Sequence, residues 1–116
     1  MQINTTIDQA ALHSTIISDN VRIDNLVQIG HNVCIGHNTI IAAQTGISGS
    51  TKIGKNCLIG GQVGIAGHLI IEDNVTIAAK SGVTKNIKKN SINAGFPAVD
   101  IKIWKKNIIN QYRKTK

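Results

Sequence analysis

The chain has 116 residues with one Phe, one Trp and one Tyr, so its core has to be aliphatic and it forms at most one domain. No apolar run reaches the length of a membrane span, and "MQINTTIDQAAL" lacks the basic flank of a signal peptide, so we expect a soluble cytoplasmic chain without a transmembrane segment. Cys34 and Cys57 form no CxxC pair, which argues against a disulfide or a thiolate metal site.

The net charge of +7 belongs to the C-terminal end of the chain. Residues 1–84 hold four Lys or Arg and five Asp or Glu, whereas residues 85–116 hold nine Lys or Arg and one Asp. Such a segment can meet an acidic protein, anionic lipid or nucleic acid, or can simply be solvated. Only Trp104 and Tyr112 are available for base stacking beyond Pro97, and no recognition motif accompanies them, so we expect no nucleic-acid partner.

The first segment, "INTTIDQAALHSTI", enters a repeat at once and shows no capping element. A stack of repeats needs a polar cap at each end, since a terminal repeat otherwise exposes its apolar face. We therefore expect the chain to be part of something longer.

The repeat has a period of six residues and dominates the sequence. Its aliphatic positions run without an insertion through Ile17, Ile23, Ile29, Ile35, Ile41, Ile47, Ile53, Ile59, Ile65, Ile71, Ile77 and Val83. The residue two places earlier is mostly β-branched or small, and residues at i and i+2 share one face of a strand. The residue that follows is mostly small and permits a tight corner.

A period of six excludes an α-helix and a coiled coil, and it fits a parallel β-helix. Three hexads close one triangular coil, with equivalent strands about 4.8 Å apart in successive coils. We predict an all-β fold of about four to five coils, of which residues 15–84 form close to four.

The C-terminal segment predicts a cap. Pro97 prevents a strand ladder from continuing, and Asp100 is suited to start a helix. Apolar residues at spacings of three and four then predict an amphipathic helix from about Ala98 to Tyr112, with one apolar and one basic face. We accordingly divide the chain into a β-helix domain, residues 1–97, and a basic helix and tail, residues 98–116.

Stacking of successive coils turns each corner of the prism into a column of residues spaced by three hexads. One column holds Asp19, His37, Lys55 and Asp73, one holds His13, His31, Gly49 and Gly67 beside Asn32, Ser50 and His68, and one holds Asn25, Ala43, Gly61 and Ala79. The first column is charged and faces solvent. The small residues of the third column suit the close approach of another subunit.

The second column separates the two histidines of the repeated tetrapeptide Ile-Gly-His-Asn. Glycine in two successive coils, at Gly49 and Gly67, opens a groove walled by backbone amides, and His31 lies at its end with His68 beside it. A linear, amide-containing arm fits such a groove. His31 is therefore our candidate catalytic residue, and His37 is a solvated corner residue.

Several strings also resemble a known family. "NTTIDQAALHSTII", "DNLVQIGHNVCIG", "GISGSTKIGKNCLIGGQVGIAGH" and "NAGFPA" are similar to hexapeptide-repeat acyltransferases, and specifically to the UDP-3-O-(3-hydroxyacyl)glucosamine N-acyltransferases of lipid A biosynthesis, from about Asn4 to Pro97. The hexapeptide repeat alone indicates only the superfamily. The "DNxxQIxHN" and "GGQxGIxGH" patterns are specific to this enzyme.

The resemblance implies a left-handed β-helix and a homotrimer with active sites between subunits. It implies transfer of a 3-hydroxyacyl group from acyl carrier protein to the 2-amino group of a UDP-sugar. By position, His31 matches the general base, and the substrate-binding set matches Asp24, Asn25, Gln28, Asn32 and His68. Gly49 and Gly67 match the groove for the phosphopantetheine arm of the carrier, and no permanently bound cofactor or metal is implied.

The chemistry agrees with this assignment. An amine that attacks a thioester loses a proton, and an imidazole with a pKa of about 6.5 can accept it at neutral pH. Negative charge develops on the thioester oxygen, for which we expect a backbone N–H near Gly49 as the donor.

The chain also departs from the family's pattern. The N-terminal uridine-binding domain and the first coils of full-length members are missing, and the usual Asp-Arg pair is Asp8-Gln9. Three alternatives therefore remain: a relative that uses a coenzyme A thioester and another acceptor, a trimer without turnover, and a zinc carbonic anhydrase of the γ type with His31, His37 and His68 as ligands. The missing HxxxxH spacing argues against the third.

Overall fold

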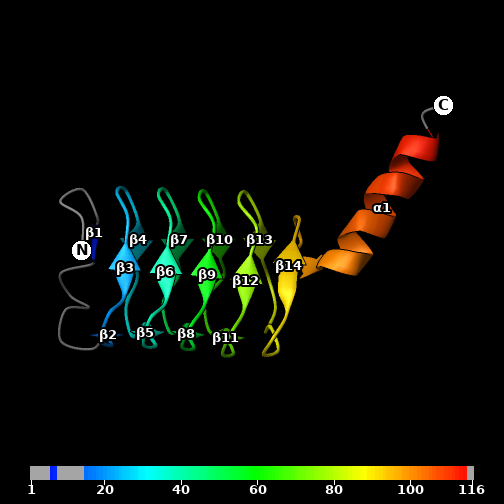
Figure 1. The fold of residues 1–116 in the computed structure, drawn as a ribbon. Helices are drawn as coiled ribbons and strands as arrows, with labels where there is room; N and C mark the ends of the chain where they lie inside the picture. The colour runs from blue at the N-terminus through cyan, green and yellow to red at the C-terminus, as the bar shows by residue number, and fades with distance from the viewer. Residues whose placement is uncertain (1–5, 8–14, 115–116) are drawn as a thin grey trace.

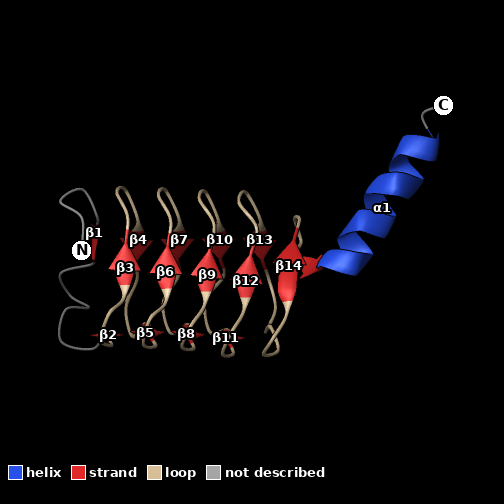
Figure 2. Cartoon of the chain, in the orientation of Figure 1, coloured by secondary structure: helices blue, strands red, loops and turns tan. Residues whose placement is uncertain are grey.

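The computed structural model describes residues 6–7 and 15–114, which form short strands followed by one helix (Figure 2). The strands are β1 (Thr6–Ile7), β2 (Ile16–Ile17), β3 (Arg22–Ile23), β4 (Gln28–Ile29), β5 (Cys34–Ile35), β6 (Ile40–Ile41), β7 (Gly46–Ile47), β8 (Lys52–Ile53), β9 (Leu58–Ile59), β10 (Gly64–Ile65), β11 (Ile70–Ile71), β12 (Thr76–Ile77), β13 (Gly82–Val83), β14 (Ile92–Ala94) and β15 (Val99–Asp100). The helix is α1 (Ile101–Lys114).

The strands form three sheets that make up the faces of a prism. Sheet A has the order β1-β4-β7-β10-β13, sheet B β11-β8-β5-β2 and sheet C β15-β14-β12-β9-β6-β3. Pairing in the repeat is parallel, and each residue pairs with its equivalent in the next coil, as in Gln28↔Gly46 and Ile40↔Leu58. Figure 1 shows the coils side by side from the N-terminal end, with α1 projecting beyond the last coil. The predicted parallel β-helix of about four coils is confirmed.

This constant interval between paired residues holds only inside the repeat. At the N-terminal end Thr6 pairs with Gln28, and at the C-terminal end Ile92 pairs with Thr76, so the interval is longer in the first case and shorter in the second. The predicted column member His13 lies outside the described residues, as do Asp8 and Gln9 and the uncapped start of the chain.

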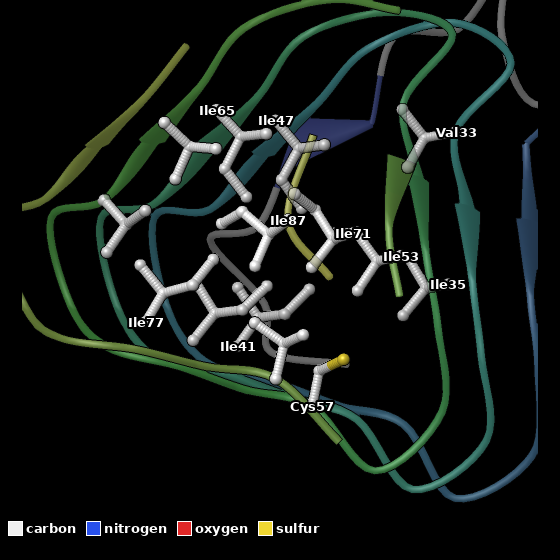
Figure 3. Packing of buried hydrophobic residues seen from close by; sticks show 14 of the residues in the cluster. Val33, Ile35, Ile41, Ile47, Ile53, Cys57, Ile65, Ile71, Ile77 and Ile87 are labelled. Atoms are coloured by element: carbon white, nitrogen blue, oxygen red, sulfur yellow. The ribbon is translucent and has the colours of Figure 1, made fainter. Parts of the chain in front are cut away.

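The core is a single column of aliphatic side chains along the prism axis (Figure 3). Every isoleucine of the repeat from Ile23 to Ile77 is at most 4% exposed, and Val83 is 2% exposed. Side chains alternate across each strand, so the second residue of each two-residue strand points inward. The residues two places earlier complete the interior, as the buried Val27, Val33 and Val63 show.

Three of these inward positions hold buried threonines, and none of the three has an orphan hydroxyl. The Oγ1 atoms of Thr39, Thr45 and Thr51 donate to backbone carbonyls 15 residues onward at 2.8–2.9 Å. A buried hydroxyl without a partner would destabilise the fold by roughly 1–3 kcal/mol. The hydrogen bonds therefore make threonine an acceptable replacement for valine here.

The corners of the coils adopt a left-handed backbone conformation. Non-glycine residues with φ between 53° and 63° recur through them, among them Asn20, Asn38, Asn56, Asn74 and Asn90. Asparagine tolerates this region better than most residues. The side chains of Asn20, Asn38 and Asn56 also hydrogen-bond in succession, at 2.8 and 3.2 Å.

The C-terminal cap begins where Pro97 is expected to end the ladder. The chain turns after β14, β15 runs back antiparallel to it, and the Ala98 N–H donates to the Gly82 carbonyl at 2.8 Å. The sequence predicts the helix from Ala98, but it begins at Ile101, because Ala98 is buried in the turn and Val99 belongs to β15. Asp100 caps it as predicted, with its Oδ1 accepting the Lys102 N–H at 3.0 Å.

Along the described part of the chain, α1 is the one helix, and no helix there combines the length and the apolar character that a bilayer crossing requires.

Candidate active site

His31 lies on the edge where sheet A turns into sheet B, in the corner between β4 and β5. The Ser50 N–H donates to the His31 carbonyl at 2.7 Å, and the His68 N–H donates to the Gly49 carbonyl at 3.1 Å. These bonds stack the corners of three successive coils. The predicted alignment of His31, Gly49 and Gly67 on one edge, with His68 beside it, is present in the structure.

Gly49 and Gly67 place no side chain on this edge in two successive coils. A Cβ on Gly49 would lie 3.3 Å from the His31 carbonyl oxygen, and a Cβ on Gly67 would lie 3.1 Å from the Gly49 carbonyl oxygen. Side chains at either position would crowd the backbone of the preceding coil. Their absence leaves this edge without side chains at the two positions stacked next to His31.

His37 lies on a different edge, between sheets B and C. Its Nδ1 accepts the Asp19 N–H at 3.2 Å, and in the next coils the Lys55 N–H donates to Asp73 Oδ1 at 2.9 Å. This column carries charges of both signs and faces solvent, as predicted. Two identical tetrapeptides thus place their histidines in different surroundings.

The remaining predicted residues flank sheet A. Asp24 and Asn25 lie on the edge between sheets C and A, where Asp24 Oδ1 accepts the Asn25 N–H at 2.7 Å. Gln28 lies on the outer surface of sheet A, and Asn32 follows His31 on the opposite edge. A single chain therefore spreads these residues across one whole face and does not gather them around His31.

Sequence reasoning missed a groove on sheet A. It has a volume of about 770 Å³ and is lined by Gln28, Ile29, Gly30, Gly46, Ile47, Ser48, Gly64, Ile65, Ala66, Gly82, Val83, Thr84 and Phe96. The outer position of four successive strands is Gln28, Gly46, Gly64 and then Gly82. The signal was available in the sequence, where these three glycines recur once per coil, each directly before an aliphatic core residue.

Among the described residues no three His, Cys, Asp or Glu side chains are grouped closely enough to hold an ion. His37 lies on another edge from His31 and His68, so the ligand set of the zinc alternative is not assembled within one chain.

Cys57 is a buried free thiol of the core, and Cys34 is partly exposed on sheet B. Burial raises the pKa of the Cys57 thiol above 9.0, and the Val75 backbone opposes this in part. The thiol is therefore neutral at physiological pH, which agrees with a structural role.

The fold and the stacked edge together define a hexapeptide-repeat protein. The model of the bacterial transferase hexapeptide family matches residues 14–49 and 50–85. The chain belongs to this family.

Within the family the chain is similar to enzymes of one reaction. It is 57% identical over 114 residues to the UDP-3-O-acylglucosamine N-acyltransferase of Rickettsia akari, a match that covers 97% of this chain and 33% of that protein. It is 52% identical to UDP-3-O-acylglucosamine N-acyltransferase 1 of Sulfurimonas denitrificans, with 89% of this chain and 33% of that protein covered. The chain thus spans about a third of the length of the curated relatives it matches.

A solved structure shows the same fold. The UDP-N-acetylglucosamine O-acyltransferase of Moraxella catarrhalis superposes with a TM-score of 0.63 and is 28% identical, covering 69% of this chain and 34% of that one. The names of these relatives describe acyl transfer onto a UDP-sugar.

Proposed function

We propose that the chain is the β-helix part of an N-acyltransferase that moves a 3-hydroxyacyl group onto the 2-amino group of UDP-3-O-acylglucosamine, in lipid A biosynthesis. The observation that carries the proposal is the edge on which His31, Gly49 and Gly67 stack, with His68 in the adjacent column. The similarity to the N-acyltransferases supports the choice of reaction. The proposal includes the cytoplasmic location expected from the sequence.

In this reaction His31 acts as the general base. The amine of the sugar attacks the thioester carbonyl, the C–N bond forms, and His31 accepts the proton that the nitrogen loses. The carbon–sulfur bond then breaks and the thiol of the donor leaves with a proton. In the described residues the Gly49 N–H donates to no other group, which supports its role as the donor to the oxygen that becomes negative.

The donor is proposed to be acyl carrier protein, with its phosphopantetheine arm along the Gly49–Gly67 edge. The arm carries amide groups, and no side chain at Gly49 or Gly67 would keep them away from the backbone of the edge. The exposed lysines of α1 provide a basic surface for an acidic carrier.

We propose that the acceptor binds between copies of the chain in a homotrimer. Asp24, Asn25 and Gln28 lie across sheet A from His31, so a site that uses them all needs edges of two subunits. Sheet C supports association, because Ile40, Leu58 and Ile92 are 41–51% exposed on its outer surface, with Thr76 between the last two.

The test is acyl transfer from 3-hydroxyacyl carrier protein to UDP-3-O-acylglucosamine by the wild-type chain and by His31→Ala. Loss of a general base lowers kcat by about 10²–10⁴-fold. His37→Ala is the matched control, since it removes the same side chain from the same tetrapeptide on another edge, and it should change kcat less than about twofold.

Each contrary outcome has its own meaning. Transfer that survives His31→Ala would refute the base assignment. Transfer from acyl coenzyme A to another acceptor, with none from the carrier protein, would replace this function by that of the coenzyme A-dependent relative. A folded trimer without any turnover would show that the chain is structural on its own.

A further inference from the structure

Helix α1 exposes apolar side chains along one side of its length. Trp104, Ile108 and Tyr112 recur every four residues and therefore follow one another on one face, with Ile109 beside them; these four form the apolar row of α1. Ile108, Ile109 and Tyr112 are 45–62% exposed, and no residue of the helix is buried. The β-helix therefore leaves most of the apolar row in contact with solvent.

The helix leaves the prism after its first turn. Its 14 residues correspond to about 21 Å of length, and Figure 1 shows them projecting beyond the last coil. One contact with the prism is made by Trp104, since a Cβ on Gly95 would lie 2.8 Å from Trp104 Cδ1. Every residue from Lys105 to Lys114 is exposed. The apolar row thus extends away from the β-helix, where a flat partner can reach it.

Cations flank the apolar row. Lys102, Lys106 and Arg113 share a second face of α1, beside Ile109. With two further lysines the helix holds five cations, and it contains no Asp or Glu. Two copies of α1 would therefore repel each other and form no salt bridge between them, whereas an anionic surface neutralises the cations of the helix together.

This combination is the one found in helices that lie in the surface of a bilayer. Such helices bury the apolar face at the boundary between headgroups and acyl chains, and their basic side chains meet anionic headgroups. Aromatic residues such as Trp104 and Tyr112 are enriched at that depth. An acidic protein accounts for the cations of α1 but not for the isoleucines beside them.

We propose that α1 lies in the surface of an anionic lipid bilayer, with the apolar row toward the acyl chains and Lys102, Lys106 and Arg113 at the headgroups. The β-helix then stands beside the membrane, and no helix of the described chain crosses it. The acceptor proposed above carries an acyl chain, and amphiphiles of this kind collect at bilayers. That link rests on the proposed function, whereas the binding of α1 to lipid does not.

Trp104 reports on the proposal directly, because it is the one tryptophan of the chain. Vesicles of phosphatidylglycerol and phosphatidylethanolamine, titrated into the wild-type chain, should shift its fluorescence emission to shorter wavelengths, and vesicles of phosphatidylcholine alone should not. Sedimentation with the same vesicles gives the partition coefficient. This coefficient should fall as the salt concentration rises, because salt screens the attraction between cations and headgroups.

Ile108→Gln with Ile109→Gln tests the apolar row without a change of charge, and glutamine favours helix. The double variant should lower the partition coefficient at least about tenfold, since it removes two buried aliphatic side chains from the bound state. Ile103→Gln is the matched control, because Ile103 is 52% exposed on the opposite side of the same helix, and it should change the coefficient less than about twofold. Circular dichroism shows whether each variant keeps the helix.

Lys102→Glu with Lys106→Glu tests the cations. Each cation near an anionic surface strengthens binding about fivefold, so the double variant should lower the partition coefficient at least about 25-fold. Lys52→Glu with Lys55→Glu, the same charge change on the prism, should have a smaller effect.

The contrary outcomes identify other partners. Equal effects of the isoleucine variants on the two sides of α1, or equal binding to phosphatidylcholine, would overturn the proposal. Binding that falls with the charge changes alone would show an electrostatic contact only, and an acidic protein would then be the partner of α1. An emission that ignores vesicles and shifts with protein concentration would show that α1 binds a second copy. Acyl transfer without vesicle binding would refute this inference and leave the proposed function intact.

Discussion

Cys57 occupies an inward position that valine or threonine fills in most other coils, and it adopts the hydrogen bonds of that position. Its N–H donates to Thr39 Oγ1 at 3.2 Å, and its Sγ lies 3.2 Å from the Glu72 carbonyl oxygen. The thiol is 2% exposed and its pKa is raised chiefly by burial. The Cys57 side chain therefore stays neutral and packs as part of the hydrophobic core.

This raised pKa predicts a loss of stability in alkaline solution. The unfolded thiol ionises first as the pH rises, so the free energy of unfolding falls from about pH 9 upward until the folded thiol also ionises. Cys57→Val keeps the aliphatic position of the repeat and should lack this component. Urea titrations of both proteins between pH 7 and pH 10 measure the difference, and parallel curves would contradict the assignment.

At the scale of elements, strands and helix owe their stability to different contacts. Within the repeat each strand has only two residues, and it is held by the coils before and after it. In α1 none of the residues is buried, and Ile103, Ile109 and Tyr112 are 51–62% exposed. The helix therefore depends on its own hydrogen bonds, on its cap and on the contact of the partly buried Trp104 with Gly95 in the preceding turn.

Removal of the N-cap should destabilise α1 and leave the stability of the β-helix unchanged. Asp100→Ala should destabilise α1 by about 1 kcal/mol, since the Lys102 N–H loses its partner. Amide hydrogen exchange should become faster in the first turn of α1 and stay unchanged at Ile41 and Ile59. Asn110→Ala, a polar-to-alanine change in the exposed middle of the same helix, should not show this effect, because alanine favours helix.

The charge of the whole molecule is unevenly distributed along the chain. Residues 1–84 are nearly neutral, and residues 85–116 hold nine Lys or Arg against one Asp. The helix that carries five of these cations projects from the end of the stack (Figure 1). A field concentrated at one end orients the approach of an acidic partner as well as attracting it.

This division predicts a salt-dependent encounter with the proposed acidic carrier. The association rate constant should fall as ionic strength rises, and Lys102→Glu with Lys106→Glu should reduce both the rate and its salt dependence. Lys52→Glu with Lys55→Glu makes the same charge change on the prism and should have a smaller effect. Stopped-flow binding to acyl carrier protein at several salt concentrations measures this, and equal effects of both pairs would argue against docking on α1.

Most of the fold could be predicted, because a strict period of six residues leaves few ways to bury isoleucine. The same arithmetic places His31, Gly49 and Gly67 on one edge without any coordinates. The helix begins three residues later than predicted, because Val99 and Asp100 form β15, which pairs antiparallel with β14. The period of six residues does not predict this pairing.

The groove on sheet A was harder to foresee. Glycine is common at corners for conformational reasons, so Gly46 and Gly64 attract attention only once the structure shows that both lie in strands and that a Cβ on either would meet no atom within 4 Å. Phe96 reaches sheet A through the turn after β14. Its contact with Gly82 depends on that turn and not on the repeat.

The constant interval between stacked residues also restricts how such a chain can change its length. A duplication or deletion of the codons for one coil would add or remove that coil whole and leave every other column in place, whereas one codon more or less would move every later isoleucine out of the interior. Genes of this kind should therefore tolerate length variation between relatives mainly in whole coils, with smaller changes confined to loops that bulge from a corner.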